Sequence, residues 1–177
     1  MIVGNTASDT IPDLEKYIGK SRVLGLDYGA KRIGIAMSDI GWIIASPVTT
    51  LETRSVFEHL LQMIHEYTVS VIVIGLPLSM GGHDGGIQDG KVKKFGQNLA
   101  HKVVQSGLQT QIRYWDERLS TKAAAVALEL MGANTNCRKK HIDRVAASII
   151  LQGFLQYLHD SKQSRLFRFS NRDSTAE

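Results

Sequence analysis

The segment from Arg22 to Asp39 constrains the fold of this 177-residue chain more than any other. Its apolar residues follow the patterns of two neighbouring strands: Val23, Leu24 and Leu26 on the first, and Ile33, Ile35 and Met37 on the second. Gly29, Ala30 and Lys31 supply a tight turn between them. The segment therefore predicts a β-hairpin with a buried apolar side.

Asp27 is the one ionised group among the buried-looking residues of this hairpin. Burying an ionised carboxylate in an apolar setting without a partner destabilises the fold by roughly several kcal/mol. We therefore expect a partner for Asp27 from elsewhere in the chain.

The rest of the chain alternates between helical and strand patterns. The expected elements are a strand Ser46–Leu51, a helix from Ser55, a strand Val69–Leu76, a glycine-rich loop Met80–Gly90, a helix from Val92, a strand Gln111–Trp115, a helix from about Ser120 to Met131 and a last helix Ile142–Leu158. Three meandering strands followed by alternating helices and strands predict an α/β fold, with a mixed five-stranded sheet and helices on both faces. The loop is interpreted as a connection in preference to a phosphate-binding loop.

Composition sets the broad class and the domain division. The chain is 43% hydrophobic and 21% charged and has a single cysteine, which fits a cytoplasmic protein without disulfide bonds or membrane spans. We expect a lead-in with a short helix at residues 1–21, one domain at 22–160, and a basic, disordered tail at 161–177. The net charge of +4 hints at a polyanionic partner without establishing one.

Two further acidic positions are candidates for the same site as Asp27. Asp143 heads the face of the last helix that carries the apolar residues Ala147, Ile150, Leu151 and Phe154, and Glu117 lies just past the fifth strand, where open α/β sheets place ligand sites. Its neighbour Asp116 would point to the opposite side of the strand. The simpler interpretations are a helix N-terminal aspartate and a solvated loop.

Three clustered carboxylates would repel one another by roughly 4 kcal/mol per pair at 4 Å and an effective dielectric near 20. A hard divalent cation is the natural compensation, because Mg²⁺ binds carboxylate, water and phosphate oxygens together. Two such ions would suit phosphodiester hydrolysis.

Four segments carry a resemblance to a known family: LDYGAKRIGIAMSD, VIVIGLPL with the glycine-rich loop, YWDERLSTKAA and IDRVAASIILQGFL. Over roughly residues 22–158 the chain resembles the YqgF family of pre-16S rRNA nucleases, which are relatives of the RuvC-type Holliday junction resolvases with the ribonuclease H-like fold. The resemblance implies a nuclease dependent on Mg²⁺ or Mn²⁺ that matures the 5′ end of 16S rRNA. By motif position, Asp27, Glu117 and Asp143 are the expected catalytic and metal-binding residues, with Asp116 in reserve.

The chain also departs from the resolvase pattern at two places. RuvC resolvases have an acid at the end of the strand that corresponds to Val69–Leu76, where this chain has Gly75 and Pro77. Resolvases also tend to carry two acids on the last helix, whereas Arg144 follows Asp143 here. Fewer carboxylates predict weaker metal binding and put the second ion in question.

The expected substrate contacts are basic residues near the acidic ends of the strands: Lys31, Arg32, Arg118, Lys139, Lys140 and Arg144. His141 is a candidate proton shuttle, although a histidine near the start of a helix is the simpler interpretation.

Three other functions are alternatives to this interpretation. A junction-resolving DNA endonuclease would act as a dimer, and the expected oligomeric state is a monomer or homodimer. An ATP-dependent phosphotransferase would need a second domain of this type, for which the chain has no room. A non-catalytic nucleic-acid-binding module would need none of the three acids.

Overall fold

The computed structural model describes residues 11–76, 85–116 and 135–173. Their elements, in chain order, are α1 (Ile11–Glu15), β1 (Arg22–Tyr28), β2 (Arg32–Ser38), β3 (Ala45–Glu52), α2 (Val56–Glu66), β4 (Val69–Leu76), α3 (Gly85–Gln105), β5 (Gln111–Asp116) and α5 (Thr135–Asp173). The five predicted strands are confirmed, and β4 has the predicted bounds.

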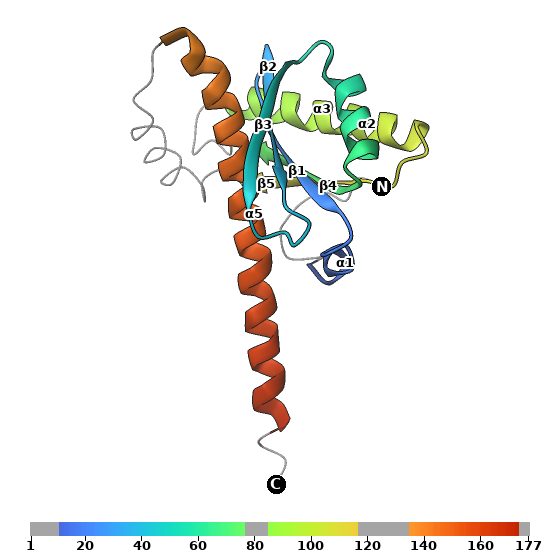
Figure 1. Cartoon of the computed structure of the whole chain (residues 1–177), viewed down its shortest axis with the longest axis vertical. Helices are drawn as coiled ribbons and strands as arrows, with labels where there is room; N and C mark the ends of the chain where they lie inside the picture. Colours follow the sequence, from blue (N-terminus) through green and yellow to red (C-terminus); the bar gives the residue numbers. More distant parts are fainter. Residues whose placement is uncertain (1–10, 77–84, 117–134, 174–177) are drawn as a thin grey trace.

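The strands form one sheet in the order β3-β2-β1-β4-β5 (Figure 1). β1, β2 and β3 are antiparallel neighbours, whereas β4 pairs parallel with β1 and β5 parallel with β4. The hairpin turn is closed by a hydrogen bond of 2.9 Å from the backbone N–H of Gly29 to the carbonyl of Arg32. This arrangement is the predicted mixed sheet with a meander of the first three strands.

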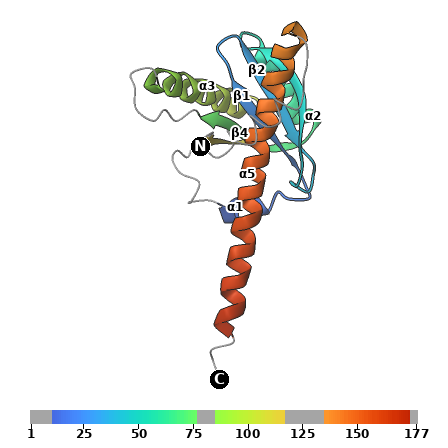
Figure 2. The same ribbon diagram turned by 90° about the vertical axis from the view of Figure 1, so that its left-hand side faces the viewer.

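Two hydrophobic clusters cover the two faces of the sheet. Alternate residues of each strand point to opposite sides, so Leu24 and Leu26 pack with α2 and α3, whereas Val23 packs with α5. Figure 2 shows α5 crossing one face while α2 and α3 lie beyond the sheet. The side on which a strand residue lies can therefore be assigned from its neighbours.

Helix α5 is longer at both ends than the sequence pattern predicted. It spans 39 residues from Thr135 to Asp173 and projects well beyond the sheet (Figure 1). The predicted bounds Ile142–Leu158 were wrong, because residues 135–141 and 159–173 are also part of the helix. The division of the chain at residue 160 into a domain and a tail stays a prediction.

The predicted glycine-rich loop Met80–Gly90 also needs correction. Helix α3 begins at Gly85, so the last six residues of that stretch are helical. The helix predicted from Ser120 to Met131 lies outside the described residues. Within the described part of the chain, no helix combines the length and apolar character that crossing a membrane requires.

Candidate active site

Asp27 lies on the side of the sheet that α5 covers. Gly25, two residues earlier on β1, is so close to α5 that an added Cβ would lie 2.6 Å from Cβ of Leu151 and 2.9 Å from the carbonyl oxygen of Ala147. Residues two apart on a strand share a side, so the Asp27 side chain also points toward α5. One helical turn before Ala147, α5 presents Asp143.

Gly34 brings Asp143 up to Asp27. Gly34 is the antiparallel partner of Asp27 on β2, and such partners have Cα atoms about 4.5–5.5 Å apart. A Cβ added to Gly34 would overlap the backbone carbonyl of Asp143, so helix and strand touch at this point. The structure therefore places the backbone of Asp143 against the residue beside Asp27.

On the other side of Asp27, the adjacent position on β4 is also a glycine. The parallel register pairs Leu26 with Ile74, and the next residues along the two strands are Asp27 and Gly75. Asp27 consequently lies in a row in which the adjacent positions of β2 and β4 carry no side chain.

Arg32 contacts the second acid directly. Its Nε donates a hydrogen bond of 2.9 Å to Oδ2 of Asp143, and the two side chains are 37% and 24% exposed. Arg32, Gly34 and Ala36 alternate on β2, and Ala36 packs in the α5 cluster, so Arg32 reaches Asp143 from the same side. The sequence predicted Arg32 as a phosphate contact and gave no signal for this ion pair.

Asp116, the last residue of β5, lies on the side of the sheet opposite to its neighbour Trp115. Trp115 packs against Phe154 of α5, with ring centroids 5.7 Å apart. Tyr114 lies on the other side and donates a hydrogen bond of 3.2 Å to the carbonyl of Lys93 in α3. Asp116 shares the side of Tyr114 and so points away from Asp27, which weakens its place as the reserve ligand.

The remaining predicted residues are described only in part. Lys31 is exposed in the hairpin turn, and Arg144 is partly buried on α5. Glu117 and Arg118 lie outside the described residues, as do the side chains of Lys139, Lys140 and His141. The predicted site is therefore represented by Asp27, Asp143 and the basic residues Lys31, Arg32 and Arg144.

The described donors suit a cation held by few protein ligands. Within residues 11–76, 85–116 and 135–173, no group of three His, Cys, Asp or Glu side chains comes together to hold a metal ion. Mg²⁺ is commonly bound by one or two carboxylates, with waters and substrate phosphates completing its shell. Asp27 and Asp143 are two such carboxylates.

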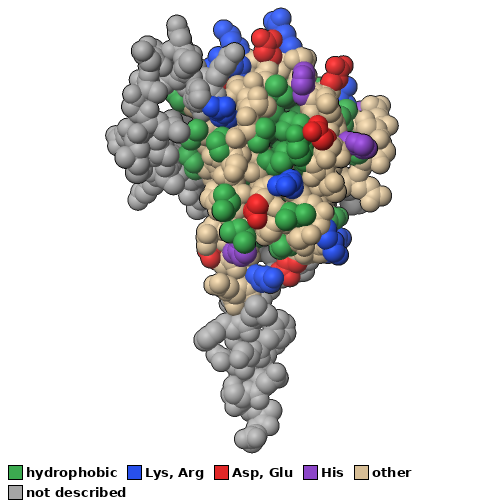
Figure 3. Space-filling view, viewed as in Figure 1, with side chains coloured by type: hydrophobic (Ala, Val, Ile, Leu, Met, Phe, Trp, Pro, Cys, Tyr) green, Lys and Arg blue, Asp and Glu red, His purple; other side chains and the backbone are tan. Residues whose placement is uncertain are grey.

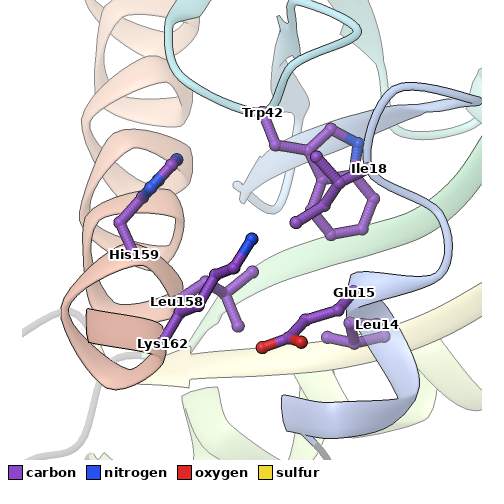
Figure 4. Close-up of a pocket in the computed structure, with 7 residues that line it drawn as sticks. All are labelled: Leu14, Glu15, Ile18, Trp42, Leu158, His159 and Lys162. Atoms are coloured by element: carbon purple, nitrogen blue, oxygen red, sulfur yellow. The ribbon is translucent and has the colours of Figure 1, made fainter. Parts of the chain in front are cut away.

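A small pocket lies at a different place, between α1 and the part of α5 past the sheet centre (Figure 4). Its lining is mostly apolar: Leu14, Ile18, Trp42 and Leu158, with Glu15, His159 and Lys162. None of the predicted site residues lines it, and it lies 15 or more residues along α5 from Asp143. This pocket is separate from the carboxylate pair.

Comparison with known sequences now adds to this geometry. The sequence model of one family, described as RuvX: Holliday junction resolvase, matches residues 21–157. The chain belongs to the RuvX family. This membership confirms the resemblance predicted from the four sequence segments.

Two relatives of this RuvX-family chain carry the name "Putative pre-16S rRNA nuclease". The protein from Caldanaerobacter subterraneus subsp. tengcongensis is 41% identical over 138 residues, which cover 76% of this chain and 95% of the relative. The protein from Agathobacter rectalis is 38% identical over 147 residues, covering 80% of this chain and 99% of the relative.

A solved structure supports the fold assignment. The yeast mitochondrial Holliday junction resolvase superposes with a TM-score of 0.50 at 12% sequence identity, covering 87% of this chain and 90% of that one. With the strand order described above, this confirms the predicted ribonuclease H-like fold of the RuvX-family chain.

Proposed function

We propose that this chain is a metal-dependent nuclease that hydrolyses phosphodiester bonds at the 5′ end of pre-16S rRNA during ribosome biogenesis in the cytoplasm. The relatives described above, about 40% identical over nearly their whole length, bear that substrate in their names. The observation that carries the proposal is that the backbone of Asp143 lies against Gly34, the strand partner of Asp27.

The metal ligands in this proposal are Asp27, Asp143 and Glu117. Trp115 faces α5, and residues two apart on an extended strand share a side, so the spacing in the sequence favours Glu117 over Asp116 as the third acid. A bound Mg²⁺ or Mn²⁺ would polarise the attacking water and the phosphate oxygens. Of these acids, Asp27 is held by β1 and Asp143 by α5, which packs directly against the sheet.

Basic residues around the acids supply the contacts to the substrate. In this proposal Lys31, exposed in the hairpin turn, binds phosphate oxygens together with Arg32 and with Arg144, the neighbour of Asp143 in the sequence. The proposed phosphate contacts also include Arg118 and Lys140, whose side chains are not described by the structure. On the face seen in Figure 3, Lys and Arg side chains are interspersed with Asp and Glu, so this face offers no broad positive surface.

A second candidate is a junction-resolving DNA endonuclease. The description of the family model, Holliday junction resolvase, favours it. Such an enzyme would cut two strands symmetrically and so would act as a dimer.

A parallel assay tests both candidates. Purified protein is incubated with Mg²⁺ or Mn²⁺ and either 5′-extended 16S precursor RNA or a four-way DNA junction. We expect cleavage of the RNA, and we expect Asp27→Asn and Asp143→Asn to lower its rate by at least about a hundredfold, the upper range seen even for outer-shell partners of metal ligands.

Asp160→Asn is the matched control, because Asp160 is exposed on the same helix as Asp143 and accepts a hydrogen bond of 2.9 Å from Gln156, one turn earlier. It should cleave as the wild type does. Cleavage of the DNA junction alone would favour the second candidate. Equal degradation by wild type and Asp27→Asn would remove the support for a nuclease centred on Asp27.

A further inference from the structure

We infer that Arg32 is the resident counter-cation of Asp143, that a divalent ion displaces it, and that the displaced guanidinium then binds substrate phosphate. This inference rests on the proposed metal-dependent function and adds to it a coupling between metal binding and nucleic-acid binding. It begins from the hydrogen bond of 2.9 Å between Nε of Arg32 and Oδ2 of Asp143.

The hairpin contains Arg32 and also contacts the backbone of Asp143 on α5. The carbonyl of Arg32 accepts a hydrogen bond of 2.9 Å from Gly29 at the turn, which fixes the backbone at the start of β2. Two residues further along, Gly34 contacts the backbone of Asp143. Asp143 is therefore held in place by the close packing of strand and helix, and the ion pair is not needed to position its backbone.

The charges around Asp143 explain why a cation is present there. Asp27 lies beside Gly34, so two carboxylates share one small region on the α5 side of the sheet. Carboxylates near one another repel, and a cation on one of them relieves the repulsion. Arg32 supplies that cation in the described structure.

The ion pair is nevertheless suited to release. With the side chains 37% and 24% exposed, solvent reaches both partners, and exposed ion pairs are weak. Nε of Arg32 occupies one lone pair of Oδ2 of Asp143, and the positive guanidinium opposes the approach of a second cation. A divalent ion between Asp27 and Asp143 would supply two positive charges and remove the reason for Arg32 to stay.

The released guanidinium would remain next to the ion, because the backbone of Arg32 is fixed. Its planar fork matches phosphate oxygens in a bidentate arrangement. Arg32 would then contact the substrate strongly when metal is bound and weakly when it is absent. A simple phosphate contact would show no such dependence on metal.

The first test measures Mn²⁺ binding by titration calorimetry in the absence of nucleic acid. We expect Arg32→Met to tighten the Kd about two- to fivefold, the range that corresponds to loss of an exposed ion pair. Arg32→Lys keeps the positive charge and should bind Mn²⁺ nearly as the wild type does. Arg22→Met is the matched control, because Arg22 lies at the other end of the hairpin and bonds to the carbonyl of Ser38.

The second test measures binding of a labelled four-way DNA junction and of precursor RNA, by fluorescence anisotropy, with Ca²⁺ or with EDTA. We expect Arg32→Met to weaken binding about threefold or more with Ca²⁺ and to have little effect with EDTA, because Arg32 is then held by Asp143. Thermal unfolding of each variant shows that the changes do not arise from loss of the fold.

The outcomes separate this inference from the proposed function. If Asp27→Asn and Asp143→Asn abolish Mn²⁺ binding while Arg32→Met leaves the Kd unchanged, the metal site stands and the role given to Arg32 is wrong. An equal loss of nucleic-acid affinity with Ca²⁺ and with EDTA would also overturn it. If the wild type binds no Mn²⁺ at all, the proposed metal-dependent function fails together with this inference.

Discussion

At the scale of single residues, Gly34 sets how closely α5 approaches the sheet at the candidate site. A Cβ at this position would overlap the carbonyl of Asp143. The overlap is with backbone, which cannot move aside as the end of a long side chain can. The absence of a side chain at Gly34 therefore allows the backbone of Asp143 to lie against β2 at the position next to Asp27.

We predict that Gly34→Ala destabilises the protein by about 1–3 kcal/mol, the usual cost of overpacking, and lowers Mn²⁺ affinity because it shifts Asp143 away from Asp27. Chemical denaturation and calorimetry measure the two effects. Gly90→Ala is the control, since a Cβ there meets nothing within 4 Å and a helical alanine should stabilise by about 0.5–1 kcal/mol. A Gly34→Ala variant with normal stability and metal affinity would contradict the close packing.

Asp39 is a second residue whose chemistry can be tested. Its Oδ1 accepts hydrogen bonds from the backbone N–H of Ile43 at 2.7 Å and of Ile44 at 2.8 Å, and its Oδ2 accepts one from Gly41 at 3.0 Å. Partial burial acts to raise the pKa of Asp39, but the hydrogen bonds from Ile44, Ile43 and Gly41 outweigh it, so the pKa lies below its ordinary value of 3.8. The carboxylate therefore organises the connection between β2 and β3.

A lowered pKa in the folded state means that the ionised carboxylate stabilises the fold above the unfolded pKa and that this stabilisation is lost as the pH falls through the folded pKa. We predict that Asp39→Asn lowers the free energy of unfolding by about 1 kcal/mol at pH 7, because charge-assisted bonds at an exposed site are weakened by water. The difference from wild type should shrink below pH 3.8. Urea unfolding of both proteins from pH 2.5 to 7 measures it, and a constant difference would contradict the assignment.

At the scale of elements, the strands could be predicted because alternation and apolar runs determine which residues pack together. β4 is apolar at nearly every position and is buried on both faces, so its bounds were predicted correctly. The convergence of Asp27 and Asp143 on the α5 side follows from the same periodicities. The contact between Arg32 and Asp143 could not be predicted, because it depends on how closely α5 approaches Gly34.

Helix α5 extends beyond its predicted ends because the charged residues that flank Ile142–Leu158 are compatible with a helix. Lys, Arg and Gln favour helices, and residues 154–173 contain neither glycine nor proline to end one. Composition in this part of the chain reports exposure to solvent and says little about backbone conformation. The helix consequently continues past its last described buried side chain, Leu158.

We predict that deletion of residues 164–177 changes the free energy of unfolding by less than about 1 kcal/mol, as expected for a segment beyond the core. Leu151→Ala is the comparison, because Leu151 is fully buried against β1 and its truncation should cost about 2–5 kcal/mol. Denaturant unfolding of the two variants beside wild type measures both values. A loss of several kcal/mol on deletion would show that the projecting part of α5 supports the fold.

At the scale of the whole molecule, metal binding and folding should be linked, because the proposed site joins β1 to α5. An ion that binds Asp27 and Asp143 connects elements more than 100 residues apart in the sequence, and the unfolded chain cannot reproduce that site. Any ligand that binds only the folded state stabilises it by mass action. The site can therefore be detected through global stability without any substrate.

We predict that Mn²⁺ at about one hundred times its Kd stabilises the wild type by roughly 2.7 kcal/mol, which for a chain of this size raises the Tm by about 5–10 °C. Asp27→Asn and Asp143→Asn should lose most of this shift, whereas Asp160→Asn, on the exposed side of α5, should keep it. Calorimetric scans with Mn²⁺ and with EDTA provide the comparison. If Asp27 is a metal ligand, Asp27→Asn must lower the affinity of the folded protein for Mn²⁺ and therefore the Tm shift. Shifts of equal size in wild type and Asp27→Asn would consequently place the bound ion elsewhere on the molecule.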